Sequence, residues 1–173
     1  MLLRLARASL EAWSGGERLP APPGGPLAAV RRGVFVTLTT RGELRGCVGR
    51  IADELPVAEA VRRMTVAAAQ DDPRFPPVPA DEVARVHIEI SVLSRPERVP
   101  APVDPARVVI GRDGVIVRQG RCAGLLLPQV AAERAWKPAA FLAATCEKAG
   151  LAADAWRDPR TEVSLFQADV FGE

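Results

Sequence analysis

Apolar residues recur at helical spacing in two segments near the start of the chain. They repeat every three or four residues from Leu2 to Trp13 and again from Val57 to Ala68, which predicts two amphipathic helices. Between them, residues 33–40 alternate in the manner of a β-strand, Arg41-Gly42 provides a turn, and residues 43–48 form a second run. We therefore expect a β-hairpin between two helices.

The second half of the chain contains further alternating runs. They predict strands at residues 86–92, 108–110, 115–117, 122–127 and 162–170. Asp113-Gly114 favours a tight hairpin turn between the second and third of these strands. Pro128 and Pro138 suit the first turn of two helices, and Gly150 suits the end of the second helix. Stretches rich in proline or glycine at 15–26, 71–79 and 96–105 predict irregular connections.

This order of elements indicates a fold class. Hairpins and helices without regular strand–helix–strand alternation are typical of an α+β fold built on antiparallel sheets with flanking helices. The chain has 173 residues, which suits one domain or two intimate subdomains. A chain of this length can bury about 70% of its unfolded surface, so it does not need disulfide bonds to fold.

The supply of metal ligands is small. The chain has 3 cysteines and 1 histidine, and Cys47, Cys122 and Cys146 lie far apart in the sequence. Structural zinc sites and iron–sulfur clusters need about four ligands at close spacing, so we expect no metal site and no resident cofactor. An odd number of separated cysteines, the absence of a long apolar run and the absence of a signal-peptide pattern predict a soluble, cytoplasmic protein.

The charge of the chain gives little reason to expect nucleic-acid binding. The formal net charge is +2, and 21 of the 23 basic residues are arginine. The densest basic region, residues 31–63, holds seven arginines and four acidic residues. Nucleic-acid sites are usually more basic and carry aromatic side chains that stack on bases, whereas this chain has eight aromatic residues and no tyrosine.

One motif is distinctive. The residues Leu44-Arg45-Gly46-Cys47-Val48-Gly49 resemble the LRGCIG signature of the AMMECR family, whose prokaryotic members are called AmmeMemoRadiSam system protein A. Other stretches resemble blocks of the same family in the same order, at residues 33–38, 72–78, 88–93, 124–131, 148–151 and 170–173. The resemblance therefore extends over nearly the whole chain.

The resemblance implies a single AMMECR-type domain over residues 1–173. It implies two intimate subdomains with a cleft between them: a larger one that contains both termini and a smaller, inserted one. For function it implies a component of a modification pathway that includes a MEMO-type protein and a radical SAM enzyme, acting on an unknown small molecule. These partners are an association recorded in the family name and assign no reaction.

Cys47 is the main candidate for chemistry. Gly46 and Gly49 would let a ligand or another backbone approach it closely, and Arg45 and Arg50 would favour the thiolate, which is the reactive form of cysteine. The resemblance implies that the loop around Cys47 lines a functional cleft. The alternative is a structural role, because free cysteine is commonly a small buried apolar residue.

Glu89 is the candidate general base. Alternation places His87 and Glu89 on the polar face of their predicted strand, and the resemblance includes Glu89 but does not require a histidine at 87. A Cys47–His87 dyad is a second arrangement that the sequence allows. The structural alternative for both residues is a solvated strand face.

Asp72, Arg74 and Phe75 form a second candidate group. A rigid proline-rich loop can hold Arg74 for bidentate binding of a carboxylate or phosphate, with Asp72 orienting the guanidinium. Arg45 would add positive charge for the same anionic group. Alternatively, Asp72 caps the preceding helix or its turn, and Phe75 fills a gap in the core.

Two main classes of function follow. The first is an enzyme or ligand-binding component, with Cys47 and Glu89 as catalytic residues and a ligand bound by Arg45, Gly46, Gly49, Asp72, Arg74 and Phe75. The second is a non-catalytic adaptor that docks the other proteins of its pathway. A nucleic-acid-binding protein, the third alternative, would need a contiguous arginine surface and a steep salt dependence of binding.

Overall fold

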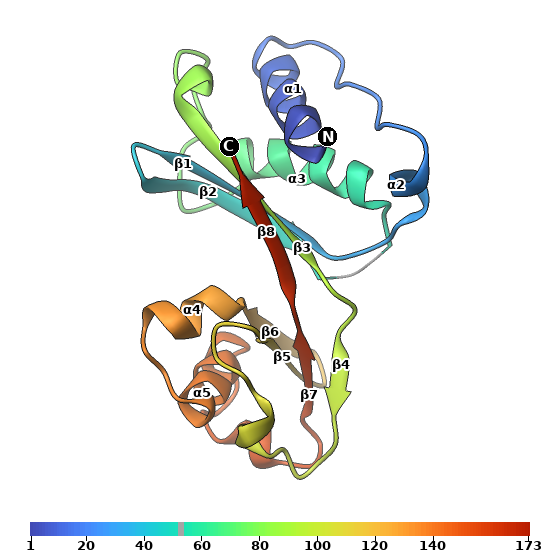
Figure 1. Ribbon diagram of the computed structural model, residues 1–173. Helices are drawn as coiled ribbons and strands as arrows, with labels where there is room; N and C mark the ends of the chain where they lie inside the picture. Colours follow the sequence, from blue (N-terminus) through green and yellow to red (C-terminus); the bar gives the residue numbers. More distant parts are fainter. Residues whose placement is uncertain (52–53) are drawn as a thin grey trace. The chain divides into compact units, whose positions relative to one another are not determined.

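The computed structural model describes residues 1–51 and 54–173 (Figure 1). The chain divides into two compact units, Met1–Leu93 with Asp169–Glu173 and Ser94–Ala168. Each unit contains one antiparallel sheet of four strands. Helices accompany both sheets, and this confirms the expected α+β class. The described helices include none that is long and apolar enough to cross a membrane.

The first unit contains both chain ends. Its sheet has the strand order β2-β1-β3-β8. The bounds of its elements are α1 Leu2–Ser14, α2 Pro26–Ala29, β1 Val34–Thr40, β2 Glu43–Arg50, α3 Val57–Gln70, the 3₁₀ helix η1 Val83–Arg85, β3 Val86–Leu93 and β8 Ala168–Gly172. The hairpin and the two long helices predicted from the periodicity are therefore present.

The two faces of the first sheet differ. Val34, Val36 and Leu38 alternate along β1 and are fully buried against α1 and α3, which lie on one side of the sheet (Figure 1). The residues between them, Phe35 and Thr37, face the other side because side chains alternate along a strand. One face thus packs on α1 and α3 as the hydrophobic core, and Phe35 and Thr37 lie on the opposite face.

The second unit has its own sheet and its own core. The strand order is β4-β7-β5-β6. The bounds are β4 Glu97–Val99, η2 Pro105–Arg107, β5 Gly114–Gln119, β6 Cys122–Leu126, α4 Pro128–Glu133, α5 Pro138–Lys148, η3 Ala155–Arg157 and β7 Glu162–Phe166. The buried face of α5, with Phe141, Leu142 and Cys146, packs in this core. Pro128 and Pro138 start their helices, as predicted, since the first helical amide needs no partner.

The predicted hairpin between residues 108–110 and 115–117 is wrong. The Val109 carbonyl accepts the amide of Asp113, and the buried Asp113 carboxylate accepts the amide of Val109, so these residues close a compact turn. Strand β5 begins at Gly114 and pairs with β7 on one side and β6 on the other. Its two edges are therefore already occupied.

The strand predicted over residues 162–170 is two strands in different sheets. Residues Glu162–Phe166 form β7 in the second unit, and Ala168–Gly172 form β8 in the first. Gln167 lies between them and exchanges hydrogen bonds with Ser94, whose hydroxyl accepts the Gln167 amide at 2.9 Å. Apolar and polar residues keep alternating across Gln167, so the periodicity alone could not show that residues 162–170 form two strands. Strand β4 was also missed, because it has only three residues between prolines.

Gly46 sets the distance between β2 and α3. A Cβ atom at this position would lie 2.0 Å from the carbonyl oxygen of Ala68, a backbone atom of α3 that cannot move away without shifting the helix. We expect Gly46→Ala to lower the free energy of unfolding by about 3 kcal/mol, because overpacking a filled interior forces the backbone apart. Urea denaturation followed by circular dichroism measures the change.

Gly24→Ala is the matched control for this prediction. A Cβ at Gly24 would meet no atom within 4 Å, and its backbone does not have a positive φ. The control should change stability by less than about 1 kcal/mol. Equal stabilities of the two variants would show that Gly46 does not limit the approach of α3.

Candidate functional site

Cys47 lies in β2 on the face of the first sheet opposite to α1 and α3. Its partner across the hairpin is Thr37, and the partner of Thr37 on the other side is Glu89. Paired residues of antiparallel strands point to the same face. Cys47, Thr37 and Glu89 therefore form one row across β2, β1 and β3. We call the surface formed by Thr37, Thr39, Cys47, His87 and Glu89 the Cys47 face.

The side chains of this row are accessible to different extents. Cys47 and Thr37 are half-buried, and Glu89 is exposed. The Thr37 hydroxyl donates a hydrogen bond to Cys47 Sγ at 3.4 Å. Because neighbouring strands lie about 4.8 Å apart, the two ends of the row are roughly 10 Å apart at the backbone. The carboxylate of Glu89 is thus too distant to take a proton from the thiol directly.

His87 belongs to the next row of the sheet. It pairs with Thr39 of β1 and is exposed. The register therefore aligns Glu89, and not His87, with Cys47. A cavity of about 220 Å³ adjoins the row on this side and is lined by Thr37, Thr39, His87, Ile88, Glu89, Gly172 and Glu173.

Asp72 and Arg74 lie at the outer edge of β2. The Asp72 carboxylate accepts the backbone amide of Cys47 at 2.8 Å, and Arg74 Nη2 donates to the Cys47 carbonyl at 3.4 Å. In effect, the two side chains take the place of a further strand at this one residue. The amide and the carbonyl of Cys47 thus point away from β1. Thr37 and Cys47 therefore form a non-hydrogen-bonded pair, the type in which side chains lie closer together. This explains the contact between their side chains.

The Asp72–Arg74 pair is itself tightly bonded. Arg74 Nε donates to Oδ1 of Asp72 at 2.9 Å, and Nη2 donates to Oδ2 at 2.7 Å. The guanidinium of Arg74 and the amide of Cys47 hold the pKa of Asp72 well below its usual range, against the effect of burial. The carboxylate in turn raises the pKa of Arg74. With two nitrogens on Asp72, Arg74 acts in the structure as an internal partner and not as a free anion receptor.

Phe75 is half-buried beside this pair. Its ring centroid lies 5.5 Å from the guanidinium carbon of Arg74, within the range of a cation–π contact. Its amide donates to the carbonyl of Asp72 and closes the turn. The side chain therefore supports Arg74, and it is not among the buried residues of the core.

Arg45 points away from Cys47. Leu38 pairs with Gly46 and Thr39 with Leu44, so Arg45 between them is the extra residue of a β-bulge, which redirects its side chain. Its Nε donates to both oxygens of Glu82 at 3.1 Å. Its Nη1 and Nη2 donate to the carbonyls of Pro76 and Pro77 at 2.7 and 3.1 Å. Arg45 thus anchors the proline-rich segment.

The two glycines of the motif have packing roles. Gly46 admits the backbone of Ala68, as described above. Gly49 pairs with Phe35, and a Cβ there would lie 2.2 Å from the ring of Phe35. The aromatic ring therefore lies over Gly49, in the row next to Cys47 on the same face. The motif gives the sequence positions of these glycines, but it does not predict which groups pack against them.

The other two cysteines differ from Cys47 in their surroundings. Cys146 is fully buried on α5, and burial raises the pKa of its thiol. Cys122 is half-buried at the start of β6. Within residues 1–51 and 54–173, no group of three or more histidine, cysteine, aspartate or glutamate side chains is arranged to hold a metal ion.

Two residues of this region were missed from sequence. Thr37 lies in the centre of the row, and Glu82 neutralises Arg45. The alternation over residues 33–40 did place Thr37 on the polar face, which was an available signal. Glu82 gave no signal, because its contact with Arg45 depends on how the chain returns to the hairpin.

Asp72→Asn tests the edge contact. At neutral pH we expect a loss of about 2 kcal/mol in the free energy of unfolding, because a charged, buried hydrogen-bond acceptor is replaced by a neutral one. The folded-state pKa of Asp72 is lowered, so its contribution is complete above the unfolded pKa of about 4 and is lost as pH falls through the folded value. Urea denaturation between pH 7 and pH 3 measures both effects.

The matched control is Asp71→Asn. Asp71 is exposed, and its side chain accepts a long hydrogen bond from the neighbouring Gln70 at 3.3 Å. This variant should change stability by less than about 0.5 kcal/mol at any of these pH values. A stability gap between wild type and Asp72→Asn that stays constant down to pH 3 would contradict the assignment.

Comparison with known proteins identifies the family. A model of the AMMECR1 family matches residues 3–171. The protein Mbar_A1807 of Methanosarcina barkeri is 43% identical over 178 residues, which cover 99% of this chain and 88% of that protein. The protein Ta0236 of Thermoplasma acidophilum is 43% identical over 175 residues, covering 99% and 85% of the two chains.

A solved structure agrees with these matches. The crystal structure of the uncharacterized protein PH0010 from Pyrococcus horikoshii superposes with a TM-score of 0.92 at 41% sequence identity. The superposition covers 99% of this chain and 89% of that one. The expected resemblance is therefore confirmed over nearly the full length, and the chain belongs to the AMMECR1 family.

Proposed function

We propose that this protein is a component of a modification pathway that also uses a MEMO-type protein and a radical SAM enzyme, and that the Cys47 face binds a small molecule of that pathway. Membership of the AMMECR1 family over residues 3–171 supports the pathway role. The observation that carries the binding site is the row of Cys47, Thr37 and Glu89 across three neighbouring strands.

The chemistry of the row suits recognition of one extended ligand. The thiol of Cys47 offers a polarizable contact at one end, and the Thr37 hydroxyl can donate or accept in the middle. The exposed carboxylate of Glu89 accepts hydrogen bonds at the other end. A ligand with a hydrogen-bond donor at one end and a length of roughly 10 Å would contact all three groups.

The same spacing limits the catalytic alternatives. A general base must come within about 3 Å of the proton it removes. Since Glu89 lies two strands from Cys47, it would act on the bound ligand and not on the thiol. The spacing therefore suits a ligand bound along the row, with Glu89 as a base toward that ligand. It does not suit a pair in which Glu89 activates Cys47 as a nucleophile.

Reaction of the three cysteines with iodoacetamide tests access to the site. At neutral pH we expect Cys47 to react faster than Cys146, because Cys47 is only half-buried whereas Cys146 is fully buried and its thiol pKa is raised. The gap between them should be at least about tenfold, since a buried thiol reacts only when the structure opens locally. Peptide mass spectrometry measures each rate, and the half-buried Cys122 is the internal reference.

An inert Cys47 would contradict the proposed site. A rate at Cys47 as slow as that at Cys146 would mean that the row is closed to small molecules. The adaptor alternative, in which the protein only docks its partners, would then take its place.

Genetic complementation tests the pathway and the site together. Deletion of this protein, of the MEMO-type protein or of the radical SAM enzyme should change the same set of metabolites, as measured by mass spectrometry. We expect Cys47→Ser and Glu89→Gln to fail to restore the wild-type profile, and Cys122→Ser to restore it. Cys122 is the matched control because it is also half-buried and lies in the second unit.

Two results would overturn the parts of the proposal separately. Unrelated metabolite changes in the three deletion strains would remove the pathway role. Full restoration by both Cys47→Ser and Glu89→Gln would remove the Cys47 face as the binding site while leaving the pathway role intact.

A further inference from the structure

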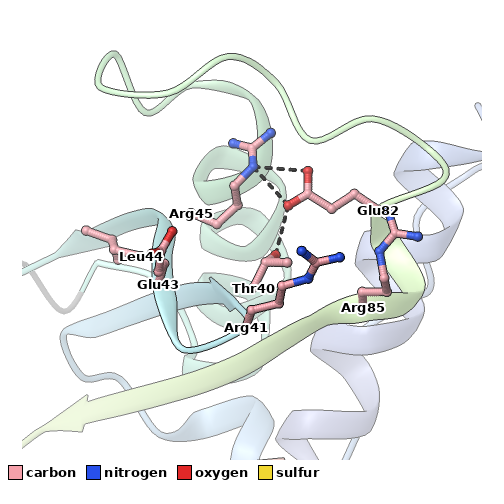
Figure 2. Close-up of a pocket in the computed structure, with 7 residues that line it drawn as sticks. All are labelled: Thr40, Arg41, Glu43, Leu44, Arg45, Glu82 and Arg85. Carbon is pink, nitrogen blue, oxygen red and sulfur yellow. Dashed lines mark hydrogen bonds and ion pairs between the residues drawn. The ribbon is translucent and has the colours of Figure 1, made fainter.

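A second pocket lies at the turn end of the β1–β2 hairpin. It has a volume of about 410 Å³ and is lined by Thr40, Arg41, Glu43, Leu44, Arg45, Glu82 and Arg85 (Figure 2). All of these residues belong to the first unit. The volume is in the range of small-molecule pockets, which usually measure about 300–1,000 Å³.

Part of the wall is a fixed polar frame. Glu82 accepts hydrogen bonds from Arg45 Nε at 3.1 Å and from the Thr40 hydroxyl at 2.8 Å, as the dashed lines in Figure 2 mark. Arg45 and Glu82 are mostly buried, with side chains 14% and 15% exposed. The charge of Glu82 is thus matched by Arg45, and this pair leaves no net charge in the pocket.

Two further arginines, Arg41 and Arg85, add positive charge that Glu82 does not neutralise. In the part of the chain that the structure describes, Arg41 forms no hydrogen bond and no ion pair. Among the same described residues, the one ion pair of Arg85 is with Asp81, at 3.4 Å, and both of these side chains are more than half exposed. Such exposed pairs are weak and can rearrange when a stronger partner arrives. Glu43 is the opposing charge on the wall, and it is exposed.

Arg41 occupies an unfavourable backbone position. Its φ is 55° and that of Gly42 is 81°, so both central residues of the hairpin turn are left-handed. Turns of this kind favour asparagine, aspartate or glycine at the first position, because other side chains are strained there. A functional role of the side chain would explain why this strained position holds an arginine. Figure 2 shows it extending from the turn into the pocket, on the same side as Arg85.

We infer that this pocket binds the phosphate group of a small phosphorylated molecule, through Arg41 and Arg85. Two guanidinium groups match the double negative charge of a phosphate monoester and offer several donors to its oxygens. Leu44 is 41% exposed at the same wall and supplies an apolar surface for the rest of the ligand. The phosphate-binding arginines are separate from the Cys47 face, since neither Arg41 nor Arg85 is among its residues, although Leu44 pairs with Thr39 of that face.

Isothermal titration of the full-length protein with inorganic phosphate and with phenyl phosphate, at constant ionic strength, tests the inference. Wild type should bind both in the millimolar range or tighter, and phenyl phosphate should bind several times more tightly because its ring contacts Leu44. Arg41→Asn and Arg85→Gln should each weaken phenyl phosphate binding at least tenfold. Asparagine suits the left-handed turn, so Arg41→Asn should fold as stably as wild type.

Arg4→Gln is the matched control, because Arg4 is exposed on α1 and its loss changes the net charge equally. It should bind phenyl phosphate like wild type. Leu44→Ser should remove the advantage of phenyl phosphate over inorganic phosphate. Benzoate, with the same ring and a single charge, should bind at least tenfold more weakly than phenyl phosphate.

Three results would overturn the inference: no saturable binding of phosphate to wild type, equal affinities of wild type and Arg41→Asn, or benzoate binding as tightly as phenyl phosphate. None of them bears on the metabolite experiment with Cys47. The two proposals can therefore fail separately.

Discussion

The hydrogen bond from the Cys47 amide to the Asp72 carboxylate is the contact on which the geometry around the motif depends. It joins the edge strand β2 to the proline-rich segment that follows α3. An edge strand has unpaired backbone groups that must find partners or water. Here Asp72 and Arg74 supply both partners at Cys47, so its backbone is fixed from the side while the thiol stays on the sheet face opposite to α1 and α3.

The other residues of the motif support the same arrangement. Gly46 allows α3 to approach β2, and Gly49 makes room for the ring of Phe35. Arg45, released from the sheet by the bulge, holds the proline-rich segment through the carbonyls of Pro76 and Pro77. Of the two polar side chains in the motif, Arg45 bonds to Glu82 and the proline-rich segment, and Cys47 lies on the sheet face opposite to α1 and α3, close to Thr37 and in line with Glu89.

These contacts divide the candidate site into two parts with different roles. Asp72, Arg74 and Arg45 are neutralised by neighbouring groups and act as a scaffold. Cys47, Thr37 and Glu89 form the accessible row, and Arg41 and Arg85 carry charge at a separate pocket. The sequence favoured Arg45 and Arg74 as receptors for an anion because arginine is suited to that task. In the folded chain, internal carboxylates and carbonyls already use most of their donors.

The sequence by itself determined the α+β class, the main helices, the first hairpin and the membership of a family. These follow from periodicity and from a local motif, both of which are properties of neighbouring residues. Tertiary structure decided which residues meet. The row of Cys47, Thr37 and Glu89 depends on strand register and on a bulge at Arg45, and the division of residues 162–170 between two sheets depends on where the chain crosses between units. Strand register, and the point where the chain passes from one unit to the other, are set by contacts between segments distant in sequence. Local sequence patterns therefore cannot predict them.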